Sequence, residues 1–383
     1  MKKVAVITTH PIQYQIPLFR ELTKNNIETH VFFASRHGVK SLKKDKEFNV
    51  KFNWDIGSNI LKGYKSFFSR KQKYNIGDFR LSYNKISSYL EKEKYDALII
   101  LGWNNLHYLK AFWYAKKYKI KTVLRVETNL KSNISFIKKY IKLLILKKFF
   151  KHFDFFLSIG KLNKNFYLHH GVNENKILDA PYFVDNNFFQ NKKNYSLIKK
   201  NKLSDKKVVL FVGKLIDRKR PLDFLKLAGL CSENKSFYFI MIGDGNLKKS
   251  CIQFIKKEKL NNVKIVGFLN QKQLSEYYSM GDLLVMTSDY ETWGLTINEA
   301  MASNMPVICS NKCGAHIDMI ENYKTGFTYP CGNILNLYKK LNLIFDNKIL
   351  LAEMKKNIKN IISKYAVKNT VESIKIILDE KKK

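Results

Sequence analysis

The stretch DYETWGLTINEA, residues 289–300, follows the apolar run 283–288 and leads into a helical pattern over residues 295–303. The apolar run predicts a buried strand, so the stretch joins a strand to a helix. A helix that begins at the carboxyl end of a parallel strand offers free backbone N–H groups and the positive end of its dipole. A phosphate suits that position. The two carboxylates of the stretch, Glu291 and Glu299, are then placed to hold uncharged hydroxyl groups on either side of it.

This stretch resembles the retaining glycosyltransferases of family 4, which have the GT-B fold. The resemblance rests on the Glu-x7-Glu spacing, on the Ala-Met that follows it, and on Trp293, Gly294 and Leu295 between the glutamates. It implies that Glu291 contacts the hydroxyls of a donor sugar, that Glu299 holds the ribose of a nucleotide, and that the three residues between them line the donor site. An ordinary surface helix with a glutamate in its first turn is the alternative interpretation.

A second motif, GKLIDRKRP at residues 213–221, follows the predicted strand 207–212. It resembles the family's Gly-Arg-Leu…Lys-Gly turn, with Lys214 in place of the arginine and Arg220 in place of the second glycine. The resemblance implies that Lys214 and Lys219 neutralise a departing diphosphate. Lysine lacks the bidentate fork of arginine, which weakens the case for Lys214. A solvated basic turn is the alternative.

Three further residues are expected at the donor site. Gly213 opens the basic turn, and Gly267 and Phe268 form a turn after the predicted strand 263–266. In relatives, the latter turn lies against the nucleotide base.

The chain begins with a strand at residues 3–8, a loop HPIQY at 10–14 and a helix at 16–25. This order predicts a doubly wound domain that binds its ligand at the carboxyl ends of its strands. His10 is expected to face the inter-domain cleft as a catalytic residue, or only to cap the helix. Arg125 and Glu127, at another strand end, either line a ligand site or pair with each other.

Residues 36–82 lack a regular pattern and are expected to form a long irregular connection used in acceptor recognition. Trp103, in a later loop, is placed either to stack on a sugar or to pack in the interior.

A chain of 383 residues predicts more than one domain. We expect an α/β protein of the GT-B class, with two Rossmann-like domains that face each other across a cleft. Residues 1–190 would bind the acceptor, residues 200–365 the nucleotide sugar, and the helix in 366–383 would return to the first domain. The resemblance is dense over residues 207–330 and thinner before them.

The composition is strongly basic, with 69 Lys and Arg against 32 Asp and Glu and a net charge of +37. Such a charge favours an anionic partner, although a lysine-rich composition alone would also produce it. Residues 134–152 form a basic amphipathic pattern that suits an anionic membrane surface or, alternatively, covers the sheet. No aromatic-basic motif of RNA-binding sheets occurs, so nucleic acid is not the expected partner.

Five cysteines lack zinc-site spacing, which predicts buried free thiols. No apolar run is long enough to span a bilayer, and the first residues lack the pattern of a secretory signal. We therefore expect a cytoplasmic protein, with peripheral binding to the inner face of the plasma membrane as an alternative.

The expected activity is the transfer of a sugar, with retention, from a nucleotide-diphosphate sugar to a hydroxyl of a glycan or lipid-linked glycan in surface polysaccharide biosynthesis. Protein cations would replace a metal, since no Asp-x-Asp motif occurs, and no cofactor is expected. A GT-B isomerase or phosphorylase of sugars remains an alternative, and a basic nucleic-acid-binding protein is an alternative of another class.

Overall fold

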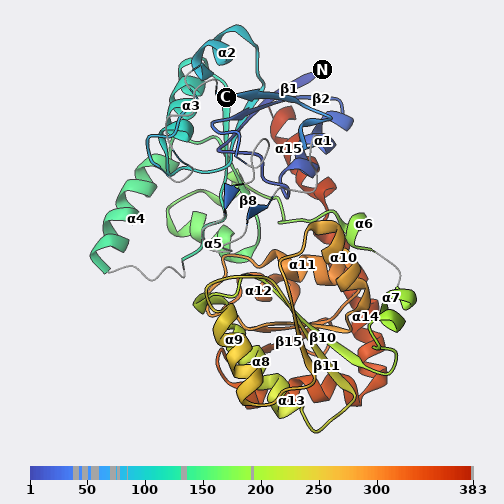
Figure 1. Ribbon diagram of the computed structural model, residues 1–383. Helices are drawn as coiled ribbons and strands as arrows, with labels where there is room; N and C mark the ends of the chain where they lie inside the picture. The colour runs from blue at the N-terminus through green and yellow to red at the C-terminus, as the bar shows by residue number, and fades with distance from the viewer. Residues whose placement is uncertain are drawn as a thin grey trace. The chain divides into compact units, whose positions relative to one another are not determined.

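The computed structural model describes residues 1–37, 43–44, 51–52, 60–69, 75, 78–83, 85–130, 136–190 and 194–380. The chain divides into two compact units (Figure 1). Unit 1 contains residues 1–42, 56–182 and 367–383, and unit 2 contains residues 43–55 and 183–366. The two-domain expectation is therefore matched by two units, with the final helix grouped with the first of them.

Unit 1 is built on a parallel sheet in the order β5-β2-β1-β6-β7-β8-β9. Its strands are nearly continuous apolar runs, as parallel strands covered on both faces usually are. The strands are β1 (Lys2–Thr8), β2 (Ile27–Phe33), β5 (Lys65–Phe68), β6 (Ala97–Ile100), β7 (Lys121–Arg125), β8 (Phe155–Ser158) and β9 (Ile177–Asp179).

The helices of unit 1 cover this sheet. Side chains of α2, α3, α4 and α5 join one face of the sheet in a single core, while α15 packs against α1 and β9. The helices are α1 (Ile16–Lys24), α2 (Ile86–Lys92), α3 (Leu106–Lys117), α4 (Phe136–Phe150), α5 (Lys161–His169) and α15 (Val367–Asp379).

The prediction that residues 36–82 are irregular was wrong for three short segments, which form strands at residues 43–44, 51–52 and 65–68. Residues Lys65–Phe68 form β5, which pairs with β2 at the edge of the sheet. Phe67 and Phe68 stack on Phe32 and Phe33 with ring centroids 4.8 and 4.9 Å apart. A four-residue edge strand that begins with an exposed lysine has too few alternating positions to show a strand pattern in the sequence. The guess that this connection recognises the acceptor falls largely on residues outside the described ranges.

Unit 2 repeats the architecture with a parallel sheet in the order β12-β11-β10-β13-β14-β15. One face of this sheet forms a core with α8, α9 and α13. The strands are β10 (Lys207–Val212), β11 (Phe237–Ile242), β12 (Val263–Gly267), β13 (Leu283–Met286), β14 (Val307–Ser310) and β15 (Gly326–Tyr329). A two-stranded antiparallel pair, β3 (Lys43–Lys44) and β4 (Lys51–Phe52), is separate from it.

The remaining elements of unit 2 are helical. They are α6 (Asn186–Phe189), α7 (Tyr195–Lys200), α8 (Pro221–Leu230), α9 (Lys248–Lys257), α10 (Gln271–Met280), α11 (Leu295–Ala302), α12 (His316–Met319), α13 (Ile334–Asp346) and α14 (Lys348–Lys364). Among the helices that the structure describes, none is long and apolar enough to cross a membrane. All five cysteines are free thiols, as expected, and four of them are buried.

The sheet of each unit has a topological switch point. The strand order reverses between β1 and β6 in unit 1 and between β10 and β13 in unit 2. In open α/β sheets, ligands bind outside the carboxyl ends of the strands at such a switch point. The loops after β10 and β13, which carry the two sequence motifs, are therefore neighbours.

Candidate active site

The loops that follow β10 and β13 are locked together by hydrogen bonds. The Thr287 hydroxyl, just after β13, donates to the carbonyl oxygens of Lys219 and Arg220 at 2.8 and 3.0 Å. The Asp289 N–H donates to the Arg218 carbonyl at 2.9 Å. These bonds fix the basic turn against the loop that carries Glu291.

Glu291 and Lys219 meet as an ion pair at this switch point. The Lys219 Nζ faces Glu291 Oε1, and the Arg218 guanidinium lies 3.3 Å from Glu291 Oε2. The side chains of Glu291 and Lys219 are only 10% and 13% exposed, so water screens the pair weakly. Glu291 Oε1 is buried against the Lys219 ammonium while Oε2 faces Arg218, so both oxygens of the carboxylate lie beside cations. The structure thus brings together the two residues on which the sequence argument depends.

Arg218 was missed by the sequence analysis. Its Nη1 also donates to the Tyr290 carbonyl at 3.1 Å, so this cation braces the loop that carries Glu291. The only signal in the sequence was its place beside Lys219 in a run of basic residues.

The backbone around Glu291 is pinned to the loop after β14. Glu291 N–H donates to the Lys312 carbonyl at 3.3 Å, and Gly314 N–H donates back to the Glu291 carbonyl at 3.0 Å. A Cβ atom on Gly314 would lie 2.0 Å from the Thr292 carbonyl oxygen, so this close approach requires glycine.

The helix α11 begins directly beside this cluster. Gly294 is its N-cap and has a left-handed φ of 110°, which leaves Leu295 as the first helical residue. The expected strand–turn–helix geometry is present, with the amino end of α11 following Glu291 by a few residues.

Trp293 packs inside the unit. It is 5% exposed, its indole Nε1 donates to Asn298 Oδ1 at 2.8 Å, and its ring lies 5.9 Å from that of Tyr365. In this arrangement the tryptophan holds the start of α11 in place. Its expected part in the donor site would therefore be to position this helix.

Glu299 lies one turn inside α11 and is 1% exposed. Its Oε2 accepts a hydrogen bond of 2.8 Å from the Tyr278 hydroxyl of α10. Tyr278 is a second residue that the sequence analysis missed, because nothing in the local pattern links α10 to α11. It fixes the orientation of the buried carboxylate.

The other expected donor-site residues occupy strand ends of the same sheet. Gly213 N–H donates to the Ile242 carbonyl at 3.0 Å, and the side chain of Lys219 runs past Gly213. Lys214 is half-buried on the same loop. Gly267 ends β12 and accepts from the Gly243 N–H at 2.8 Å, with Phe268 half-buried beside it.

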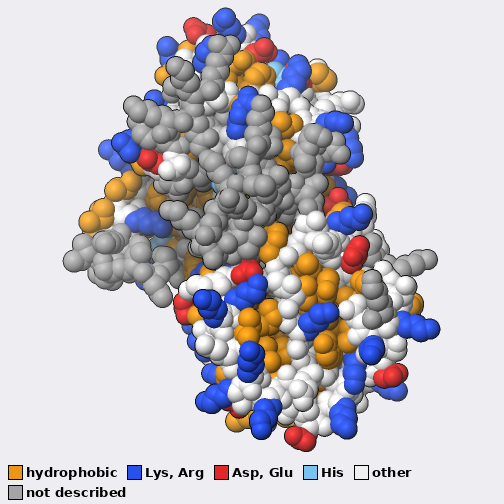
Figure 2. All heavy atoms as spheres, viewed as in Figure 1, with side chains coloured by type: hydrophobic (Ala, Val, Ile, Leu, Met, Phe, Trp, Pro, Cys, Tyr) orange, Lys and Arg blue, Asp and Glu red, His pale blue; other side chains and the backbone are white. Residues whose placement is uncertain are grey.

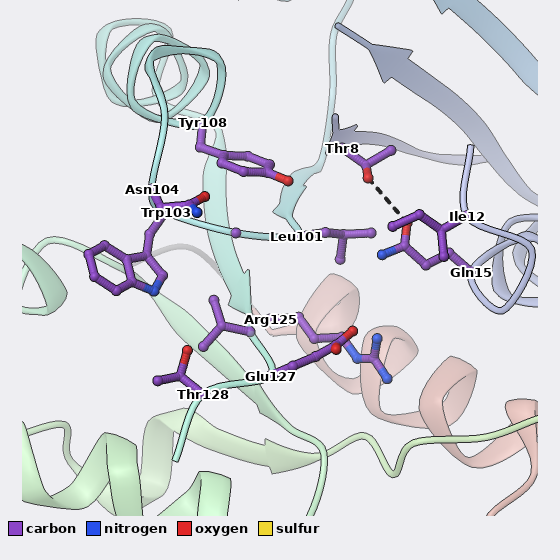
Figure 3. A pocket seen from close by; sticks show the side chains of 12 residues that line it. Thr8, Ile12, Gln15, Leu101, Trp103, Asn104, Tyr108, Arg125, Glu127 and Thr128 are labelled. Atoms are coloured by element: carbon purple, nitrogen blue, oxygen red, sulfur yellow. Dashed lines mark hydrogen bonds between the residues drawn. The ribbon is translucent and has the colours of Figure 1, made fainter. Parts of the chain in front are cut away.

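Unit 1 has a cavity of about 260 Å³ at its own switch point (Figure 3). Trp103 and Gln15 lie on opposite sides of it, while the hydroxyl of Tyr108 points toward the middle. It is lined by residues at the carboxyl ends of β1, β6 and β7 and from the loops beyond, namely Thr8, Ile12, Gln15, Leu101, Gly102, Trp103, Asn104, Tyr108, Arg125, Val126, Glu127 and Thr128.

Two of the residues that line this cavity, Arg125 and Glu127, contact Tyr182. The Tyr182 hydroxyl donates to Glu127 Oε1, and the Arg125 guanidinium lies 5.3 Å from the centre of the Tyr182 ring. Both side chains line the cavity, and their membership of a ligand site stays a prediction.

His10 lies in the loop after β1 but does not line this cavity. Its Nδ1 is 2.9 Å from the Thr9 hydroxyl, and its ring packs edge-on against His37 with centroids 5.4 Å apart. Burial, and to a lesser extent the nearby His37, lowers the pKa of His10 to about 4. His10 is therefore neutral near pH 7, and its expected catalytic role is untested.

Comparison with known proteins agrees with this geometry. Residues 194–361 match the family model described as "Glycosyl transferases group 1". The chain is 30% identical over 171 residues to the poly(ribitol-phosphate) alpha-N-acetylglucosaminyltransferase of Staphylococcus aureus (strain COL), covering 43% of this chain and 34% of the relative. The matches to three other relatives likewise span only 62%, 40% and 38% of their lengths.

A longer match is found in Campylobacter jejuni subsp. jejuni. Its GalNAc-alpha-(1->4)-GalNAc-alpha-(1->3)-diNAcBac-PP-undecaprenol alpha-1,4-N-acetyl-D-galactosaminyltransferase is 23% identical over 271 residues, 70% of this chain and 71% of that protein.

Among solved structures, Alr3699/HepE of Anabaena, crystallised with UDP and glucose, superimposes over 100% of both chains with a TM-score of 0.72 and 15% identity. This similarity shows the fold. The chain therefore has the GT-B fold of two Rossmann-like domains, and its residues 194–361 are similar to the glycosyl transferases group 1 family.

Proposed function

We propose that this protein transfers a sugar from a nucleotide-diphosphate sugar to a hydroxyl of a glycan or lipid-linked glycan, with retention of the anomeric configuration. The observation that carries the proposal is the Lys219–Glu291–Arg218 cluster at the switch point of unit 2, beside the amino end of α11. Such a site offers positive charge for phosphates and a buried carboxylate for hydroxyl groups in one place.

In the proposed complex, the diphosphate lies against the first turn of α11 and is neutralised by Lys219 and Lys214. Glu291 accepts hydrogen bonds from hydroxyls of the donor sugar. Glu299, held by Tyr278, accepts from the hydroxyls of the ribose. The turn at Gly267 and Phe268 would lie against the base.

The proposed chemistry is a front-face substitution. The bond between the anomeric carbon and the diphosphate oxygen breaks, and the acceptor oxygen forms its bond to that carbon on the same face. The acceptor proton passes to the departing diphosphate. Lys219 stabilises the charge that develops on the leaving group, which is the preorganised electrostatic role that contributes most to many enzymes. We propose that no metal is required for this step.

The acceptor site is proposed to lie in the cavity of unit 1. The cavity combines an aromatic side chain, Trp103, with polar groups from Gln15, Asn104 and Glu127, a mixture suited to sugar rings that expose both C–H faces and hydroxyls. The names of the S. aureus and C. jejuni relatives refer to a poly(ribitol-phosphate) and to an undecaprenol-linked glycan. They support an acceptor of the surface polysaccharide class.

The experiment is a screen of nucleotide-diphosphate sugars for thermal stabilisation of the full chain, which identifies the donor by mass action. The stabilising donor is then incubated with glycan acceptors, with and without a metal chelator. The proposal predicts release of nucleoside diphosphate together with an elongated acceptor whose new linkage keeps the donor's configuration. Free sugar or sugar phosphate as the product would instead indicate an isomerase or phosphorylase, and an inverted linkage would contradict retention.

A further inference from the structure

The outward face of α4 is apolar. Tyr140, Ile141, Leu144 and Ile145 are 57%, 51%, 51% and 61% exposed and lie on successive turns of one helix. The opposite face of the helix is anchored in the core of unit 1 by Leu146 and Phe150. Figure 2 shows hydrophobic side chains on the surface where Figure 1 places α4.

This pattern differs from that of an ordinary surface helix. Such a helix buries one apolar stripe and presents polar residues to water, whereas a helix that is apolar on both sides has a partner on each. Exposed hydrophobic residues scattered singly are normal. Four on one helical face form a contiguous patch of the kind that marks an interaction site.

The charge on α4 identifies the kind of partner. The helix contains five lysines and no acidic residue. Lys147 and Lys148 are exposed on the next turn of the same outward face, followed by Lys151. Lysine is depleted in the cores of protein–protein interfaces. Lysines beside exposed apolar side chains are instead typical of helices that lie in the interfacial region of an anionic bilayer.

A small cavity lies beside this helix. It measures about 220 Å³ and includes Lys139 and Lys142 of α4 together with Phe166, His169 and His170. The Lys142 ammonium lies 5.5 and 5.8 Å from the ring centres of Trp103 and Phe166. Burial lowers the pKa of Lys142, so an anion seated in the cavity would offset the cost of keeping that lysine charged.

We propose that α4 docks unit 1 on an anionic phospholipid bilayer. Tyr140, Ile141, Leu144 and Ile145 enter the boundary between headgroups and acyl chains. Lys147 and Lys148 contact the headgroups, and the cavity at Lys142 receives a lipid phosphate. This inference does not depend on the proposed transfer reaction, because it uses none of the residues at the two switch points as binding groups.

The test is flotation of the full chain with vesicles of phosphatidylcholine alone and of phosphatidylcholine mixed with phosphatidylglycerol. Binding should require phosphatidylglycerol and should weaken as salt is added. In the triple variant Ile141→Gln/Leu144→Gln/Ile145→Gln, the affinity for these vesicles should fall by more than about tenfold. Each substitution removes an apolar side chain that the bilayer would bury. The matched control is Leu335→Gln/Ile349→Gln, two residues that are 65% and 74% exposed elsewhere. It should bind as the wild type does.

A second set of variants tests the contribution of the α4 lysines. Lys147→Gln/Lys148→Gln should weaken binding by about thirtyfold, while Lys256→Gln/Lys257→Gln, an exposed pair on α9, should have a much smaller effect. Lys142→Gln should also weaken binding to the vesicles that contain phosphatidylglycerol. Thermal unfolding of each variant checks that it is folded.

Several outcomes would overturn the proposal. One is the absence of binding to phosphatidylglycerol vesicles at low salt, and another is equal loss of binding in the α4 variants and their controls. Equally strong binding to phosphatidylcholine alone would contradict the charge argument. A self-associated wild type that the triple variant converts to monomer, without vesicle binding, would identify the patch as a protein interface instead. Unchanged binding by Lys142→Gln would show that the cavity at Lys142 does not receive a lipid phosphate.

Discussion

The two switch points of the molecule share a topology but differ in chemistry. In unit 2, the crevice between β10 and β13 holds a charged cluster whose loops are hydrogen-bonded to each other. In unit 1, the equivalent position between β1 and β6 opens into a cavity lined by aromatic and polar side chains. The sheet order thus sets where a ligand binds, and the loop residues set which ligand it is.

The family match follows the same division. It covers residues 194–361, which fall almost wholly in unit 2. This is what we expect if the handling of a nucleotide diphosphate is common to the family, whereas the cavity of unit 1 serves an acceptor that differs among its members.

The largest effect should come from Lys219→Ala. Removing one preorganised charge donor commonly reduces kcat by about 10²–10³-fold. The control is Lys226→Ala, a half-exposed lysine of α8 that pairs with Asp223. Steady-state kinetics with saturating donor and acceptor provide the measurement, and near-normal turnover of the Lys219 variant would refute its role.

Glu299→Ala should mainly weaken the binding of free nucleoside diphosphate. The loss of hydrogen bonds to a charged group corresponds to about 1.5–3 kcal/mol, or roughly ten- to a hundredfold in Kd. Tyr278→Phe, which removes one hydrogen bond to the carboxylate, should give a smaller effect in the same direction. Calorimetric titration measures both, and an unchanged affinity of the Glu299 variant would argue against ribose binding.

Gly314→Ala tests whether the Glu291 loop depends on its close backbone approach. The added methyl would meet the Thr292 carbonyl, so we expect a loss of about 1–3 kcal/mol in the free energy of unfolding. Gly229→Ala is the matched control, because its Cβ meets only Leu260 at 3.8 Å within α8. Because Gly229 lies within a helix, this substitution should raise the free energy of unfolding by about 0.5–1 kcal/mol. Urea denaturation distinguishes the two, and equal stabilities would contradict the packing argument.

In unit 1, Trp103→Ala should raise KM for the acceptor while leaving the affinity for nucleoside diphosphate unchanged. Loss of an aromatic contact corresponds to about 0.5–1.5 kcal/mol, or two- to tenfold. Trp113→Ala, which removes a tryptophan that is 58% exposed on α3, should leave both constants unchanged. If the Trp103 variant instead loses affinity for nucleoside diphosphate, the proposal that unit 1 binds the acceptor and unit 2 the nucleotide would be contradicted.

The last prediction concerns pH. His107 is fully buried; its Nδ1 accepts from the Tyr83 N–H, and its Nε2 lies 3.1 Å from the Thr8 carbonyl. Burial lowers the pKa of His107 from 6.5 to about 4. Between these values the unfolded chain binds more protons, so the free energy of unfolding should fall as pH decreases from 6.5 to 4. His107→Gln should reduce this slope in chemical denaturation, whereas His152→Gln at the surface should not.

The sequence predicted the elements that have strong local patterns. The strand–turn–helix unit around Gly294, and the position of Glu291 and Lys219 at strand ends of one sheet, follow from parallel-sheet topology and motif order. Their ion pair was not predicted. The contacts that it did not predict cross between elements. Tyr278 reaches Glu299 from α10, and Arg218 braces the Tyr290 carbonyl, neither of which a linear pattern encodes.

Two further features depended on tertiary packing. The strand β5 is too short to show a period, and only its stacking on Phe32 and Phe33 makes it recognisable. The lysines of α4 suggested a helix with an apolar inner face and a charged outer face. The outer face in fact also carries Tyr140, Ile141, Leu144 and Ile145, and burial alone could reveal which side each residue takes.

The central claim is that the crevice between β10 and β13, and not the cavity between β1 and β6, binds the nucleotide diphosphate. Hydrogen–deuterium exchange of the full chain, with and without saturating nucleoside diphosphate from the stabilising donor, tests it directly. The account predicts slower exchange in residues 213–220 and 289–299 and unchanged exchange in residues 101–104 and 125–128. Protection of the unit 1 segments, with none in unit 2, would contradict it.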